Sequence, residues 1–126
     1  MNGIEIRSIE VTNAEQLLLA NDCVHDLFFN LDDLIVQDGA IRIMILFQGG
    51  WRGAVDPSVV MIIRNVTRME VRDTERVGWY DVNTLKWEDG CLTITTGIPL
   101  ELKVWVSSLH ITLLNCGDKR TETGSR

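Results

Sequence analysis

Residues 85–94, which read LKWEDGCLTI, decide the fold, because an Asp-Gly pair stands between two runs of alternating apolar and polar side chains. Asp and Gly both tolerate the positive φ that a two-residue type I′ turn needs at its central positions. Folding the chain at Asp89-Gly90 makes these facing pairs: Glu88–Cys91, Trp87–Leu92, Lys86–Thr93 and Leu85–Ile94. The apolar pairs share one face, which predicts an antiparallel β-hairpin.

A second Asp-Gly pair, Asp38-Gly39, stands within LIVQDGAIRI, residues 34–43. The same folding makes the pairs Val36–Ile41 and Leu34–Ile43. On the returning strand Met44 and Leu46 take the opposite parity from the inward side chains. We therefore expect both faces of that strand to be covered.

Alternating apolar runs recur at 4–11, 24–36, 40–47, 59–72, 77–82 and 100–113, with a slip at Asp32-Asp33 that predicts a bulge. Thr12 followed by Glu15 is typical of a capping box and predicts one short helix over residues 13–20. A single helix leaves a parallel sheet without crossovers. The chain is thus predicted to be all-β and mainly antiparallel, a two-sheet β-sandwich or flattened barrel of about eight or nine strands with one short N-terminal helix.

The 126 residues suit one domain, predicted over residues 1–116 and followed by a polar tail at 117–126. A net charge of −6 disfavours nucleic acid and anionic membranes as partners. The sequence shows no signal-peptide pattern and no apolar run of membrane length. Cys23, Cys91 and Cys116 form an odd set without a Cys-x-x-Cys pair, so we expect reduced thiols and a cytoplasmic location.

Two acidic segments are candidate sites. His25-Asp26 follows the predicted helix, two residues after Cys23. A metal needs three or four ligands, and no tight ligand pair is present, so we expect no metal and no cofactor, and His25 is either a hydrogen-bonded structural residue or a binding residue. Asp32-Asp33 is either a solvated bulge or an acceptor for a basic partner.

Two aromatic positions are candidate contacts. Trp51 and Arg52 lie in the glycine-rich segment 48–53, and both residue types are enriched at binding hot spots. The alternative is that Trp51 folds back over an open end of the sheet. Trp105 stands on the polar parity of its strand, so it either anchors an interface or packs under the helical residues 17–19.

The order of these features resembles a group of small uncharacterised bacterial β-proteins. The pieces that carry the resemblance are His25-Asp26, the hairpin at 34–43, the phrase at 66–71 and the strands from Tyr80 to Leu113. Some proteins of this kind are described as immunity proteins that neutralise a bacterial toxin. The resemblance implies a binding module without catalytic residues.

Two functions follow as expectations. The first is a non-enzymatic module that binds another protein or a second copy of itself. The alternative is a small-molecule site lined by Trp51, Trp79, Trp87 and Trp105. A metal-dependent enzyme built on Cys23, His25 and His110 is the third reading.

Overall fold

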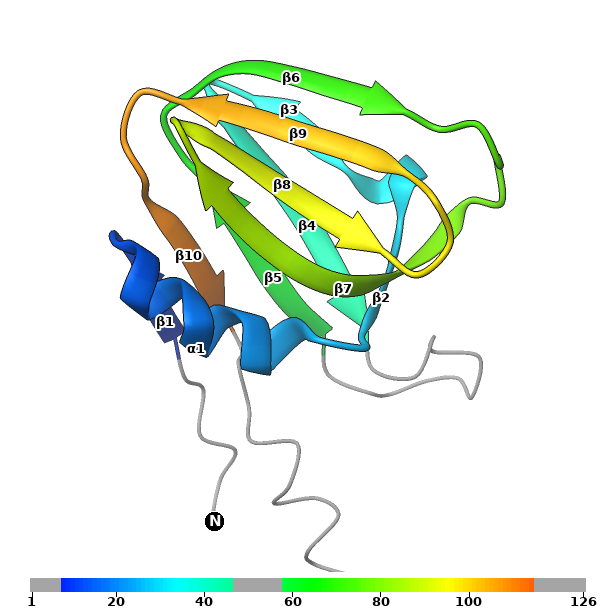
Figure 1. Cartoon of the computed structure of the whole chain (residues 1–126), viewed down its shortest axis with the longest axis horizontal. Coiled ribbons are helices and arrows are strands. Elements are labelled where there is room, and N and C mark those ends of the chain that lie inside the picture. The colour runs from blue at the N-terminus through cyan, green and yellow to red at the C-terminus, as the bar shows by residue number, and fades with distance from the viewer. Residues whose placement is uncertain (1–7, 47–57, 115–126) are drawn as a thin grey trace, which may run out of the picture.

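The computed structural model describes residues 8–46 and 58–114, which form one helix and a single open antiparallel sheet (Figure 1). The helices are α1 (Ala14–Val24) and the short 3₁₀ turn η1 (Leu31–Asp33). The strands are β1 (Ser8–Val11), β2 (Phe28–Asn30), β3 (Ile35–Gln37), β4 (Ala40–Leu46), β5 (Ser58–Ile63), β6 (Val66–Arg72), β7 (Trp79–Glu88), β8 (Cys91–Thr96), β9 (Glu101–Val106) and β10 (Ile111–Leu114).

The strand order is β1-β10-β5-β4-β2-β7-β8-β9-β6, with β3 beside β4. The predicted antiparallel all-β class is therefore confirmed, although the 10 strands belong to one hydrogen-bonded sheet. In Figure 1 the β7-β8-β9-β6 part lies in front of β3, β4 and β5. Among the described strands, the three-residue β2 is the one that pairs with both parts, with β4 on one side and β7 on the other.

Both Asp-Gly turns have the predicted conformation. The φ angles are 52° and 73° at Asp38-Gly39 and 53° and 77° at Asp89-Gly90. At the second turn, all four predicted cross-strand pairs are present between β7 and β8. At the first turn Val36 faces Ile41, and the ladder begins one residue after Leu34.

The expected bulge at Asp32-Asp33 is wrong in detail. The chain makes the 3₁₀ turn η1 there, and the Asn30 side chain accepts a hydrogen bond from Asp32 N at 2.8 Å. This local cap competes with the ladder, so the predicted continuous strand divides into β2 and β3.

One face of the sheet forms the hydrophobic core. Strands from both sides of β2 contribute to it, and the side chains hidden from solvent belong to one cluster. The largest fully buried ones are Phe29, Ile41, Ile43, Ile45, Met61, Ile63, Tyr80, Leu92, Ile94, Leu102, Ile111 and Leu113. Each such side chain stabilises the fold by about 1.5–3 kcal/mol through burial.

Helix α1 begins one residue later than the capping box predicts. Asn13 is the N-cap, and its side chain accepts from Gln16 N at 2.8 Å, while the Gln16 side chain accepts from Thr12 N at 2.7 Å. The capping hydrogen bonds thus involve Asn13 and Gln16 in place of Thr12 and Glu15, and the Gln16 side chain binds the N–H of Thr12, one residue before the N-cap. The helix runs to Val24 and packs against β1 and β7.

Polar side chains of α1 complete the edge of β7 where β2 no longer pairs with it. Asn21 Oδ1 accepts from Leu85 N at 2.6 Å, and Asn21 Nδ2 donates to Leu85 O at 3.2 Å. The His25 ring nitrogen Nδ1 lies 2.8 Å from Asn83 O. Asn21 and His25 therefore provide partners for backbone groups of β7 that no neighbouring strand pairs with.

The expectation of reduced cysteines is wrong for one residue. Cys23, in the last turn of α1, is disulfide-bonded, whereas Cys91 on β8 carries a free thiol. Spacing along a sequence does not show which thiols the fold brings within bonding distance.

We expect Asn21→Ala to lower the free energy of unfolding by about 1–3 kcal/mol, because both Leu85 backbone groups lose their partner. Denaturant unfolding measures this effect. Asp22→Ala, at the exposed neighbouring position, is the control and should change stability by less than about 0.5 kcal/mol. Equal losses in the two variants would contradict the role of Asn21.

Candidate interaction surface

His25 and Asp26 directly follow α1, and their hydrogen bonds connect the end of this helix to β7. His25 N donates to Asn21 O, and Asp26, at φ 70°, donates its backbone N–H to Val82 O at 2.8 Å. The His25 Nε2 atom lies 3.5 Å from Asp26 Oδ2. These contacts favour the structural interpretation of the pair.

The other predicted site residues lie on separate parts of the chain. Asp32 and Asp33 are exposed on η1, and Trp51 and Arg52 lie outside the described residues. Trp105 is half-buried on β9 with the Arg68 guanidinium 4.6 Å from its ring centroid. Of the two alternatives for Trp105, packing under the helix gains no support, because the main contacts of α1 are with β1 and β7.

The described tryptophans do not converge on a cavity. Trp79 and Trp87 stand at opposite ends of β7, about 26 Å apart along an extended strand. Trp87 packs against the core, whereas Trp105, which faces Cys91 in the ladder, has the opposite parity on β9 from the buried Val104. The structure gives no support to a pocket lined by these three residues.

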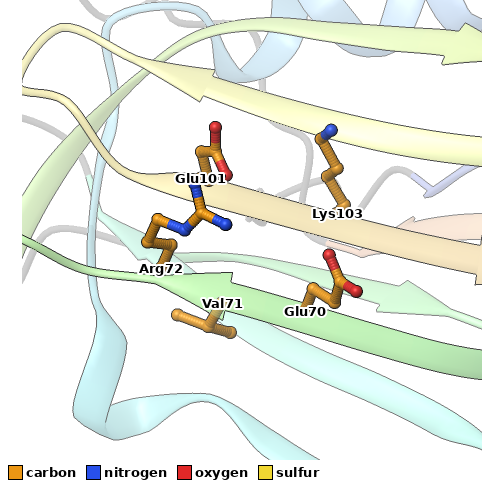
Figure 2. Close-up of a pocket in the computed structure, with 5 residues that line it drawn as sticks. All are labelled: Glu70, Val71, Arg72, Glu101 and Lys103. Atoms are coloured by element: carbon orange, nitrogen blue, oxygen red, sulfur yellow. Dashed lines mark ion pairs between the residues drawn. The ribbon is translucent and has the colours of Figure 1, made fainter.

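A surface pocket of about 280 Å³ lies on β6 and β9 instead (Figure 2). It is lined by Glu70, Val71, Arg72, Glu101 and Lys103. An Arg72–Glu101 ion pair at 3.5 Å crosses it, so its charges already compensate one another. Small-molecule sites are mostly apolar, and this pocket is not.

No group of three or more His, Cys, Asp or Glu residues could hold a metal ion in the parts of the chain that the structure describes. Nor does any helix among residues 8–46 and 58–114 have the length and apolar character needed to cross a membrane.

The side of the sheet that faces away from the core carries an unexpected concentration of apolar side chains. Ladder register aligns Met44 with Val60 and Val60 with Leu114 across β4, β5 and β10. A neighbouring row runs from Ile35 through Arg42, Ile62 and Thr112 to Glu10. Phe28 and Leu46 form the adjoining pair on β2 and β4. We call this surface the outer apolar face: Phe28, Ile35, Met44, Leu46, Val60, Ile62 and Leu114.

This face is open to solvent at several points. Ile35 is 49% exposed, Met44 44% and Leu114 37%, and the other members are half-buried. The expectation that both faces of β4 are covered is therefore not met at Met44 by the described residues. Contiguous exposed apolar surface on a sheet commonly marks an interaction site.

A polar network borders the outer apolar face on the β1 side. Glu10 Oε1 lies 2.8 Å from His110 Nε2 and accepts from Thr112 Oγ1 at 2.9 Å. Arg64 Nε donates to the same hydroxyl at 3.3 Å. Hydrogen bonds from His110 and then Thr112 hold the pKa of Glu10 below its usual 4.5, so the carboxylate stays ionised at neutral pH.

Tyr80 is the other group with a shifted pKa, and it lies away from this surface. Burial, together with a hydrogen bond to Asp73, raises the pKa of its phenol. Asp73 also accepts from Arg76 N at 3.0 Å, so the Tyr80 hydroxyl anchors the connection between β6 and β7. This arrangement is structural.

The chain matches no protein-family model, no curated protein and no solved structure. The resemblance to immunity proteins accordingly stays a prediction. Any proposal about function must therefore rest on the exposed side chains of the molecule.

Sequence reasoning did not single out the outer apolar face. Its members come from five strands, and each looks ordinary within its own run. The signal that could have found it is the pair Met44 and Leu46, whose parity is opposite to that of the core residues on β4.

We expect Glu10→Gln to change the pH dependence of folding. A depressed pKa stabilises the folded state above the usual 4.5, and this stabilisation is lost as the pH falls through the folded-state value. Wild type should therefore unfold less readily than the variant at neutral pH, and the difference should shrink below pH 4.5. Denaturant unfolding over a pH series measures it, with Glu88→Gln as the matched control. A difference that does not vary with pH would contradict the assignment.

Proposed function

We propose that this protein is a non-enzymatic protein-binding module and that the outer apolar face is its recognition surface. One observation carries the proposal. Seven apolar side chains on adjacent strands share the face that does not contribute to the core, and three of them are more than a third exposed. Exposed apolar side chains on one sheet face are what a partner protein covers in a stable complex.

The border of the surface fits this role. Glu10 lies at the β1 end of one apolar row, beyond Thr112, and Arg42 lies within that row between Ile35 and Ile62. Protein interfaces combine apolar side chains with polar and charged ones, among which arginine is enriched. Binding of this kind needs no reacting group.

We also propose that the single sheet folds over at β2 into a flattened sandwich, with the two parts packed against each other. This packing would give the outer apolar face a rigid support. Buried side chains from both sides of β2 belong to one cluster. Val66 N, at the start of β6, donates to Gly39 O in the β3–β4 turn at 2.8 Å, which links the two parts a second time. The predicted cytoplasmic location loses its support from the cysteines, because the disulfide at Cys23 is typical of oxidising compartments.

The methionines provide a test. Met44 lies on the proposed surface, Met69 is half-buried on β6 and Met61 is fully buried. Thioether oxidation follows exposure. In an extract of the native host, we expect Met44 to oxidise several-fold more slowly than in dilute purified protein, because a partner covers it.

Mass spectrometry of oxidised peptides measures the three rates, and those of Met69 and Met61 should not change. Leu114→Glu, on the same surface, should remove the protection of Met44. An oxidation rate of Met44 that is the same in extract and in dilute solution would overturn the proposal.

A further inference from the structure

We propose that the outer apolar face binds a second copy of this chain, packed face to face about a twofold axis parallel to β5. This inference rests on the proposed function and names its partner. The axis follows from the register, because β5 is the middle strand of the rows that cross β4, β5 and β10.

Rotation about this axis exchanges β4 with β10 and returns β5 onto itself. Val60 then meets Val60 of the second copy, and Ile62 meets Ile62. Met44 meets Leu114, because both belong to the row that contains Val60. A twofold interface needs a surface that is complementary to itself, and this apolar row meets that condition.

The same rotation brings opposite charges together. Arg42 lies on β4, one strand to one side of the axis, and Glu10 lies on β1, two strands to the other side. Arg42 of one copy therefore faces the strand pair β10–β1 of the other, within reach of Glu10. Each dimer contains this contact twice, and complementary charges of this kind set the register of an interface.

Arg64 is the charged residue nearest the proposed twofold axis, so in the dimer it approaches Arg64 of the second copy. It follows β5 directly, and its Nε donates to Thr112 Oγ1 toward the β10 side. The two Arg64 side chains thus lean away from each other. The depressed pKa of Glu10 keeps the carboxylate charged for the contact with Arg42.

The expected size of the contact indicates a weak dimer. From β3 through β4, β5 and β10 to β1 there are five strand positions about 4.8 Å apart, each a few residues long, so the face covers roughly 20 by 20 Å, on the order of 400 Å² on each copy. Stable complexes bury about 800 Å² on each partner. We therefore expect a dissociation constant in the micromolar range or weaker, with the dimer visible only as concentration rises.

Charge reversal gives a sharp experiment. Arg42→Glu creates two Glu–Glu contacts in the dimer, and Glu10→Arg creates two Arg–Arg contacts. Sedimentation velocity over a concentration series should show each variant alone with a dissociation constant raised at least about tenfold. A mixture of the two variants restores two Glu–Arg contacts, so it should form a heterodimer at concentrations where neither variant alone associates.

Lys86→Glu, an exposed reversal on β7, is the control and should dimerise as wild type does. Circular dichroism establishes that each variant is folded, and Met44→Glu replaces Glu10→Arg as the disrupting variant if the latter does not fold.

Wild type that stays monomeric at every concentration would overturn the inference, as would a mixture that associates no better than its components. If purified protein is monomeric while Met44 is protected in host extract, the partner is another protein and the proposed function stands. Absence of both effects removes the proposed function as well.

Discussion

The two-residue period of a β-strand is the constraint on which this structure depends. Once the type I′ turns at Asp38-Gly39 and Asp89-Gly90 set which residues face each other, every side chain on four strands is assigned to one of two faces. A slip of one residue would move the buried Leu85 and Ile94 to solvent. The same assignment places Met44 on the outside, because Ile43 and Ile45 are inside. Core and outer apolar face are thus two consequences of a single register.

Local information explains which parts of the fold the sequence predicts. A hairpin with an Asp-Gly turn involves residues close in the chain, so its pairs can be counted from the turn, and all four around Asp89-Gly90 are correct. The helix is also predicted, but its N-cap is Asn13, whose side chain accepts from Gln16 N, while the Gln16 side chain accepts from Thr12 N. The turn η1 was missed because the Asn30 side chain offers the backbone a local alternative to the ladder.

Contacts between distant residues explain the remaining errors. Asn21 and Leu85 are 64 positions apart, and nothing in either segment shows that an amide on a helix completes a strand. Trp105 illustrates the same limit, because its place beside Arg68 depends on the pairing of β6 with β9. The disulfide at Cys23 and the outer apolar face likewise arise only when separate runs meet.

Two free strand edges of the sheet are protected against pairing with another chain. β6 is a terminal strand, and Arg68, Glu70 and Arg72 make it a charged one with a register shift near its start. Charged side chains and register shifts on an edge strand discourage pairing with another chain. The ion pairs Arg68–Glu70 and Arg72–Glu101 fit this role, so the charged pocket of Figure 2 is explained without a bound ligand. The edge of β7 is covered by Asn21 of α1 and by His25, the C-cap residue that follows this helix.

Residues 8–46 and 58–114 provide no such protection for the outer apolar face. The buried side chains of the inner face form the hydrophobic core, and the members of the outer apolar face do not belong to that cluster. The chain charges the β6 edge and covers the free edge of β7, yet it exposes Ile35, Met44 and Leu114 on one sheet face, as expected for a surface that a partner covers.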